Sequence, residues 1–165
     1  MITRIAISVA VSFCTLLFAS SPQSKDQGSK ATGKPRTRAL ATIRVQSSEA
    51  RLYDKIAGLG LAEVNISEAF NGDIDGQSTV RALQVQREDK SATLVSMQRF
   101  EGKLGGRHGT FVLQGSEIVE KGKIKATWFV VPRSGTGELL GLRGEGGFEG
   151  GFGKGSDGWL EYWFE

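Results

Sequence analysis

Polar side chains within otherwise apolar, alternating segments are the residues of this sequence best placed to do chemistry. A carboxylate, guanidinium or amide on such a strand either faces solvent or points inward, where it supplies one of the few convergent polar groups that a ligand pocket requires. Both orientations stay open, because successive strand residues alternate in direction and both faces of these strands are partly apolar. The candidate ligand-binding residues are Glu68, Arg81, Gln84, Gln98, Gln114 and Glu161.

No group of residues typical of an enzyme or of a metal site accompanies these candidates. His108, the only histidine, lies in a glycine-rich turn, and Cys14, the only cysteine, lies in the apolar start of the chain. A structural zinc site needs about four nitrogen, sulfur or oxygen ligands, and a Ser-His-Asp triad needs a histidine held in place by its neighbours. The sequence therefore predicts no metal, no cofactor and no catalytic residue.

The glycine-rich stretch 134–148 is interpreted as a structural turn. Glycine suits backbone positions with positive φ or close approach to another segment. Leu139, Leu140 and Leu142 are expected to anchor the turn by packing inward or against the neighbouring strand. Arg143 has two interpretations, a donor to carbonyl groups of the turn or a site for an anionic ligand. The residues assigned to the turn are Gly135, Gly137, Gly141, Arg143 and Gly144.

Short apolar or alternating segments, separated by turn signals, follow one another along most of the chain. This spacing is typical of an all-β barrel or sandwich. Residues 48–61 are expected to form a short helix or an irregular connection. Residues 145–152, in which Glu-Gly-Gly-Phe occurs twice in succession, are expected to form a long loop, either a mobile lid or a tolerated insertion. The predicted strands are 41–46, 61–70, 78–86, 92–103, 109–117, 123–131 and 159–164.

The beginning of the chain differs from the rest. A basic start and an apolar run from Ile5 to Ala19 predict a signal peptide over residues 1–21, with no clear cleavage site. An uncleaved anchor is the alternative, although the run is shorter than the roughly 20 residues that span a bilayer. Residues 22–38, rich in Ser, Gln, Lys and Gly, predict a flexible basic linker. We therefore expect a secreted or periplasmic protein with one domain over residues 39–165 and no membrane span after signal removal.

The net charge of +3 is concentrated at the beginning of the chain. From residue 39 onward there are 15 Lys and Arg residues against 17 Asp and Glu residues, a net charge of −2. A nucleic-acid surface needs basic residues clustered on the folded domain, so no nucleic-acid partner is expected.

Three stretches resemble a known family. They are 70–79, Phe-Asn-Gly-Asp-Ile-Asp-Gly-Gln-Ser-Thr; 99–114, Arg-Phe-Glu-Gly-Lys-Leu-Gly-Gly-Arg-His-Gly-Thr-Phe-Val-Leu-Gln; and 134–148, Ser-Gly-Thr-Gly-Glu-Leu-Leu-Gly-Leu-Arg-Gly-Glu-Gly-Gly-Phe. In this order they resemble the bacterial family of unknown function DUF3224, over residues 39–165. The resemblance implies a small antiparallel β-barrel of about eight strands, similar to allene oxide cyclase and the dirigent proteins. It implies no activity, because the family has none assigned.

The chain departs from the family pattern at polar positions. An acidic residue is usual where this chain has Arg81 and Gln98, and a histidine often follows Phe-Val-Leu-Gln, where this chain has Gly115. If the family has an acid–histidine site, this member has lost it.

Three functions are compatible with these features. The leading prediction is an exported barrel that binds a small apolar or amphipathic molecule without catalysis. An isomerase or cyclase is the alternative, by fold analogy alone, so whether the protein is an enzyme stays open. The third is a structural protein in which an exposed barrel face forms an oligomer.

Overall fold

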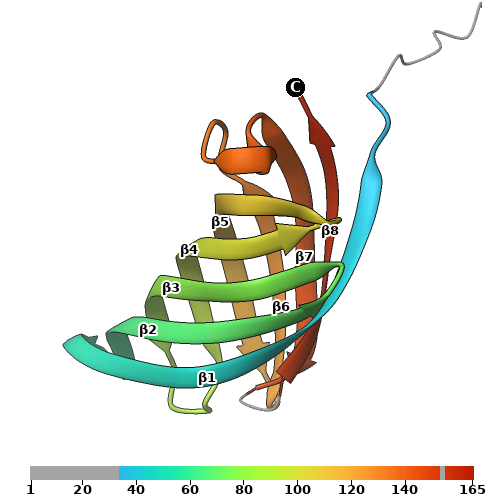
Figure 1. Cartoon of the computed structure of the whole chain (residues 1–165). Coiled ribbons are helices and arrows are strands. Elements are labelled where there is room, and N and C mark those ends of the chain that lie inside the picture. Colours follow the sequence, from blue (N-terminus) through green and yellow to red (C-terminus); the bar gives the residue numbers. More distant parts are fainter. Residues whose placement is uncertain (1–33, 153–154) are drawn as a thin grey trace, which may run out of the picture. The chain divides into compact units, whose positions relative to one another are not determined.

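Eight antiparallel strands form a closed barrel in the computed structural model, which describes residues 34–152 and 155–165. Each strand pairs with its neighbours in sequence, and the first strand pairs with the last, as Figure 1 shows in chain order from blue to red. The predicted eight-stranded barrel is confirmed. The predicted signal peptide and most of the predicted linker lie outside the described residues. The elements are β1 (Thr37–Ile56), β2 (Leu59–Gly72), β3 (Ile74–Gln86), β4 (Ala92–Leu104), β5 (Arg107–Glu120), β6 (Lys123–Val130), the short 3-10 helix η1 (Gly137–Leu139), β7 (Leu142–Gly151) and β8 (Gly155–Phe164).

Two-residue turns connect several of the hairpins. Gly105 and Gly106 join β4 to β5 with φ of 57° and 83°, and Lys121 and Gly122 join β5 to β6 with φ of 50° and 73°. Positive φ at both central residues defines the turn whose twist matches that of the paired strands. The glycines that marked these turns in the sequence therefore also set the register of the hairpins.

Residues 48–61 form most of a long hairpin, and the expectation of a helix or irregular connection is wrong. β1 continues to Ile56 and β2 begins at Leu59. The second half of β1 pairs only with β2, because its pairing with β8 ends at Ile43. Both faces of this half are exposed, and the register shifts twice along it, so burial imposes no alternation on its sequence. Figure 1 shows the hairpin extending past the neighbouring strands.

Residues 145–151 belong to β7, so the expectation of a long loop there is also wrong. β7 pairs with β6 on one side and β8 on the other. A Cβ on Gly146 would lie 2.1 Å from the carbonyl oxygen of Trp159 and 2.6 Å from Nε1 of Trp128. The glycines of this strand therefore allow close approach of neighbouring groups rather than flexibility.

Two apolar clusters fill the barrel, one larger than the other. The larger contains Phe70, Phe100, Phe111 and Trp128, with Phe70 edge-to-face on Phe100 at a centroid distance of 5.5 Å. The smaller consists of Val64, Ala82, Ala92, Leu94 and Val119. Along β2, β4 and β5, the inward-facing side chains belong to the smaller cluster at one end of the strand and to the larger cluster at the other. Between these two ends the inward-facing side chains include polar ones.

Candidate ligand-binding cavity

Five polar side chains are buried at these intermediate inward positions. On β4, two of them lie between Leu94 of the smaller cluster and Phe100 of the larger one. They form a polar layer, defined as Glu68 on β2, Ser78 on β3, Ser96 and Gln98 on β4, and Glu117 on β5.

Glu68 is held by two neighbours within the polar layer. Gln98 donates from Nε2 to Glu68 Oε2 at 2.7 Å and to Ser78 Oγ at 2.7 Å. Ser78 donates its hydroxyl to the same oxygen of Glu68 at 3.3 Å. The two hydrogens of the Gln98 amide allow both of its bonds at once, so three strands are joined through one carboxyl group.

Glu117 is only partly satisfied. Ser96 donates its hydroxyl to Glu117 Oε1. Glu117 Oε2 has no hydrogen-bond partner among the described residues, although the residue is only 7% exposed. A buried polar atom without a partner is uncommon in folded proteins and destabilising.

Both carboxyl groups are harder to ionise than in water. Burial raises the pKa of Glu68 to about 7; hydrogen bonds from Ser78 and Gln98 lower it, and the nearby charge of Glu117 raises it. Burial also raises the pKa of Glu117, against the lowering effect of the Ser96 hydrogen bond. The polar layer therefore contains two interacting acids, at least one of which titrates near neutral pH.

The polar layer borders a cavity of about 210 Å³. Aliphatic and aromatic side chains form most of its wall, among them Ile43, Val64, Ile66, Leu94 and Phe148. Glu68, Gln84, Ser96, Gln98 and Glu117 supply polar atoms, and the described lining contains no Lys, Arg or His. An apolar cavity of roughly 150 Å³ accommodates benzene, so this one has room for a substituted ring or a short chain.

Three of the six sequence candidates border this cavity. Glu68, Gln84 and Gln98 are brought together there. Arg81 and Gln114 are exposed on the outer face, and Glu161, also outward, lies 3.4 Å from Arg38. Strand alternation explains the difference, because each of these three stands between inward-facing neighbours.

Glu117, Ser78 and Ser96 were missed as candidates. Glu117 is an even number of residues away from Phe111 and Leu113, so all three lie on one face of β5, and this spacing is the signal that could have identified it. Because the sequence does not show which face of the strand points inward, this spacing alone does not distinguish Glu117 from an exposed acid.

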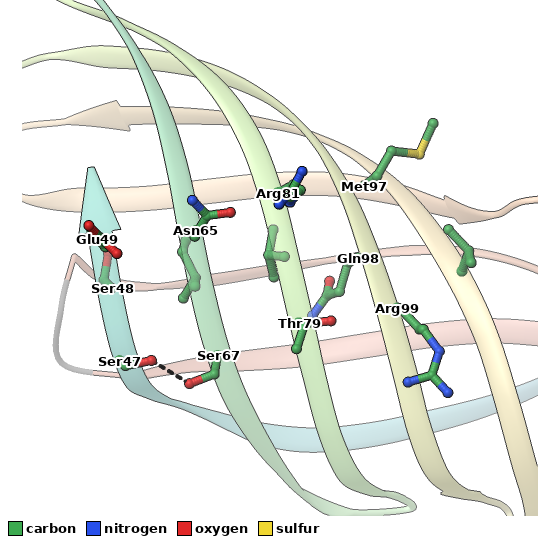
Figure 2. A pocket seen from close by; sticks show the side chains of 13 residues that line it. Ser47, Ser48, Glu49, Asn65, Ser67, Thr79, Arg81, Met97, Gln98 and Arg99 are labelled. Carbon is green, nitrogen blue, oxygen red and sulfur yellow. Dashed lines mark hydrogen bonds between the residues drawn. The ribbon is translucent and has the colours of Figure 1, made fainter. Parts of the chain in front are cut away.

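A larger hollow of about 610 Å³ lies along β1 to β5. Figure 2 shows Arg81, Met97 and Arg99 spread along β3 and β4 without converging on one point, and Ser47 bonded to Ser67. Most of these side chains are exposed to solvent. Because a binding site for a small molecule needs enclosure and convergent polar groups, the interior cavity is the stronger candidate.

Most residues of the glycine-rich turn have the structural role that the sequence predicts, but Leu140 does not. Gly137 and Gly141 have φ of 60° and 77°, and Leu139 and Leu142 are fully buried, as expected. Leu140 instead is 75% exposed, so the expectation that it packs inward or against the neighbouring strand is wrong.

The other turn residues have different roles. A Cβ on Gly135 would lie 2.0 Å from the carbonyl oxygen of Leu139, so close approach requires glycine there. Gly144 lies within β7 and has no positive φ. Arg143 pairs with the carboxylate of Glu165 at 2.9 Å, rather than with carbonyl groups of the turn. It therefore links the start of β7 to the last residue of the chain.

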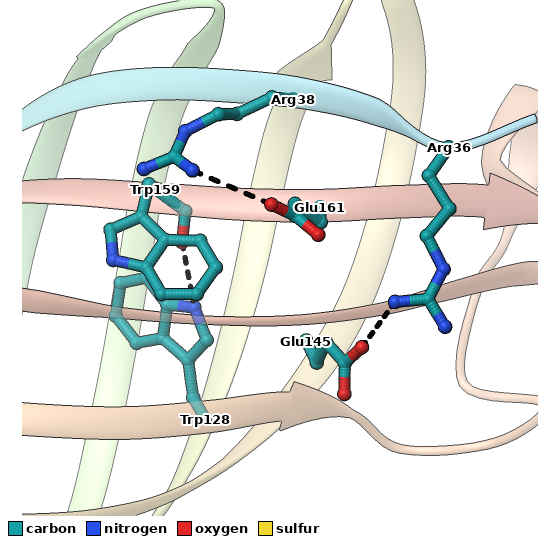
Figure 3. Close-up of polar contacts among 6 residues, drawn as sticks. All are labelled: Arg36, Arg38, Trp128, Glu145, Trp159 and Glu161. Carbon is teal, nitrogen blue, oxygen red and sulfur yellow. Dashed lines mark hydrogen bonds and ion pairs between the residues drawn. The ribbon is translucent and has the colours of Figure 1, made fainter.

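Two arginines at the start of β1 form ion pairs with side chains on the outer face of the barrel. Arg36 forms an ion pair with Glu145, and Arg38 pairs with Glu161 while its guanidinium lies 4.8 Å from the ring centroid of Trp159 (Figure 3). β1 begins at Thr37, so the last two residues of the predicted linker belong to the barrel.

Comparison with known proteins agrees with this barrel. A family model described as a protein of unknown function, DUF3224, matches residues 39–165. The chain belongs to the DUF3224 family. A crystal structure of a DUF3224 protein of unknown function from Shewanella oneidensis MR-1 is 28% identical, with a TM-score of 0.68, and the match covers 79% of this chain and 99% of that one. No curated protein matches the chain.

The DUF3224 barrel has few other groupings suited to chemistry within its described residues. There, no three or more His, Cys, Asp or Glu side chains gather as a metal site would require. His108, the histidine singled out in the sequence, is exposed, and its backbone N–H donates to Glu138 at 2.8 Å. Over the same residues, no helix has the length and apolar character needed to cross a membrane.

Proposed function

We propose that this DUF3224 protein binds a small, partly apolar molecule inside its barrel. The observation that carries the proposal is the partly enclosed, mostly apolar cavity of about 210 Å³ with four residues of the polar layer on its wall. Such a combination supports binding because the wall supplies transfer free energy and the few polar atoms fix the orientation of the ligand.

Thermal-shift measurements test the proposal with small aromatic and short aliphatic molecules. Ala82 is buried on the cavity wall, so Ala82→Leu fills space that a ligand would occupy. We expect ligands to raise the unfolding temperature of the native chain and not that of Ala82→Leu. Arg81→Leu is the control, because it introduces the same side chain one position away on the outer face. Equal ligand shifts in the native chain and Ala82→Leu would contradict binding in this cavity.

An isomerase or cyclase is the second candidate, and Glu68 is the residue that favours it. A carboxyl group with a pKa of about 7 can accept or give a proton at neutral pH, as a general acid or base must. Glu161 faces outward and cannot serve a reaction in the cavity. Turnover of a bound ligand that is lost in Glu68→Gln and kept in Glu161→Gln would favour the enzyme.

An oligomeric role is supported by a different surface. Leu83, Val95, Met97, Ile118 and Phe129 are exposed on the outer faces of β3 to β6. Exposed apolar side chains grouped in this way are typical of association surfaces. A molar mass from light scattering equal to that of the monomer at high concentration would count against this role.

We also propose that the protein is exported, on the basis of residues 1–21 alone. Their basic start and apolar run support a secretory signal. Mass spectrometry of the protein recovered outside the cytoplasm should find an N-terminus near residue 21. Recovery of the intact chain only from the cytoplasm would contradict export.

A further inference from the structure

We infer that the molecule bound in the cavity is a small primary amine, with its ammonium group on Glu117 Oε2 and its apolar body against the aliphatic wall. This inference rests on the proposed function and adds the chemical class of the ligand.

The geometry around Glu117 leaves one strong acceptor unused. Oε1 accepts the hydroxyl of Ser96, Oε2 has no partner in the described part of the chain, and Glu117 is one of the residues that line the cavity. Gly115 makes room for this pair, because a Cβ there would lie 2.5 Å from Glu117 Oε1 and 2.6 Å from Ser96 Oγ. The carboxyl group is therefore built into the cavity wall with one oxygen left without a hydrogen-bond partner.

The charges that face the cavity favour a cation. Two acids, Glu68 and Glu117, border it, and they are close enough for the charge of Glu117 to raise the pKa of Glu68. The polar side chains that the other described strands contribute are neutral: Ser48, Gln84, Ser96, Gln98 and Ser156. A ligand cation would relieve the repulsion between the two acids, whereas an anion would add to it.

The donor count also matches an ammonium group. An ammonium has three donors and no acceptor, so it can satisfy Glu117 Oε2 and still reach a neighbouring oxygen of the polar layer. An alcohol and an ammonium can both donate to the carboxylate, but only the ammonium adds the attraction between opposite charges. A neutral alcohol of the same shape should therefore bind more weakly, and a carboxylic acid more weakly still.

Isothermal titration with three probes of matched shape tests the inference in the full-length chain. At pH 7.5, benzylamine should bind about tenfold more tightly than benzyl alcohol, because its ammonium adds an attraction between opposite charges that the hydroxyl lacks. Benzoate should bind weakest. In Glu117→Gln the preference for benzylamine should fall to about twofold or less, because the amide carries no charge. The control Glu161→Gln, on the outer face, should keep the native preference.

A second measurement does not depend on a folded variant. Lowering the pH from 7.5 to about 5 protonates Glu68, whose pKa is about 7, shifts Glu117, whose pKa is raised by burial, toward its neutral form, and leaves benzylamine charged. The affinity of the native chain for benzylamine should therefore fall over this range, while that for benzyl alcohol should stay constant.

The outcomes separate this inference from the proposed function. Binding of benzyl alcohol as tight as that of benzylamine overturns the amine and leaves the barrel as a binding protein. An unchanged preference in folded Glu117→Gln overturns it as well. Lys154 lies outside the described residues, so Lys154→Gln is tested as well. If benzylamine binds to this variant and not to the native chain, the ammonium of Lys154 takes the place of the ligand, and the inference is overturned. If none of the probes and none of the molecules of the thermal-shift panel binds, the proposed function falls and this inference with it.

Discussion

Glu68 should make the stability of the barrel depend on pH. Its pKa is about 7 in the folded chain against 4.5 for the ordinary side chain, so the folded state holds the proton more tightly. The contribution of Glu68 to the free energy of unfolding should therefore be greatest below about pH 4.5 and fall by roughly 3 kcal/mol as the pH rises through 7. The raised pKa of Glu117 acts in the same direction. Urea unfolding at several pH values between 4.5 and 8 measures this slope.

Glu68→Gln should remove much of that slope, because the amide does not titrate and can still accept from Gln98 and Ser78. Glu161→Gln is the matched control, since Glu161 lies on the outer face beside Arg38. A slope in Glu68→Gln equal to that of the native chain would show that the pH dependence has another source.

Some residues of the polar layer could be identified from the sequence, but whether their side chains face inward or outward could not. Glu68, Gln84 and Gln98 could be selected as polar residues on apolar strands, and the structure places all three at the cavity. Arg81, Gln114 and Glu161 met the same criterion and face outward. The criterion fails because the outer face also carries apolar side chains such as Leu83 and Val95, so hydrophobicity alone does not identify the inside.

At the scale of elements, η1 anchors one end of the barrel through a single side chain. Leu139 is fully buried in the larger cluster, while the next residue, Leu140, is exposed. Leu139→Ala should lower the free energy of unfolding by about 2–5 kcal/mol, because it leaves a cavity in a packed core. Leu140→Ala should change it by less than about 0.5 kcal/mol. Chemical denaturation of the two variants compares them directly, and equal midpoints would contradict the anchoring role.

β7 supplies a second test, at a glycine that the sequence placed in a loop. A Cβ on Gly150 would lie 2.3 Å from the carbonyl oxygen of Gly155 and 2.6 Å from the Cα of Ser156. Gly150→Val should therefore cost at least about 2 kcal/mol through displacement of β8, within the range of severe substitutions. Glu149→Val is the control on the same strand, where an exposed ion pair with Lys125 contributes at most about 1 kcal/mol.

Comparable unfolding midpoints for Gly150→Val and Glu149→Val would mean that β7 can shift away from β8 without loss of stability.

Gly141→Val should also lower the free energy of unfolding, by about 1–3 kcal/mol, because the φ of 77° at Gly141 disfavours a β-branched residue. Substitution of glycine is thus expected to destabilise both the turn and β7. A high density of glycine in the sequence does not by itself distinguish a flexible loop from a tightly packed strand.

For the whole molecule, strand spacing and the resemblance were enough to predict the closed eight-stranded barrel. Most of the predicted strands lie inside observed ones. What the sequence hid was the second half of β1, which is exposed on both faces, and β7, whose glycines carry no side chains to alternate. Both errors arise because alternation reports the burial of side chains on one face. The second half of β1 buries neither face, and in β7 glycines occupy the inward positions between Leu142 and Phe148.

The closure of the barrel gives the last prediction. β1 meets β8 only from Thr37 to Ile43, and Arg36 and Arg38 add ion pairs and aromatic contacts on the outer face beside this short seam. A chain that begins at residue 39, where the family match begins, should still fold, because five of the seven paired positions remain.

It should nevertheless be about 1–4 kcal/mol less stable than a chain that begins at residue 34, since two exposed ion pairs contribute about 0.2–1 kcal/mol each and two cation–π contacts about 0.5–1 kcal/mol each. Urea unfolding of the two chains measures the difference. Replacing Arg36 and Arg38 by Ala in the chain that begins at residue 34 should reproduce most of the loss if the side chains stabilise the seam. Identical midpoints for the two chains would show that the barrel closes without residues 34–38, and that the domain starts at residue 39 as the sequence alone predicted.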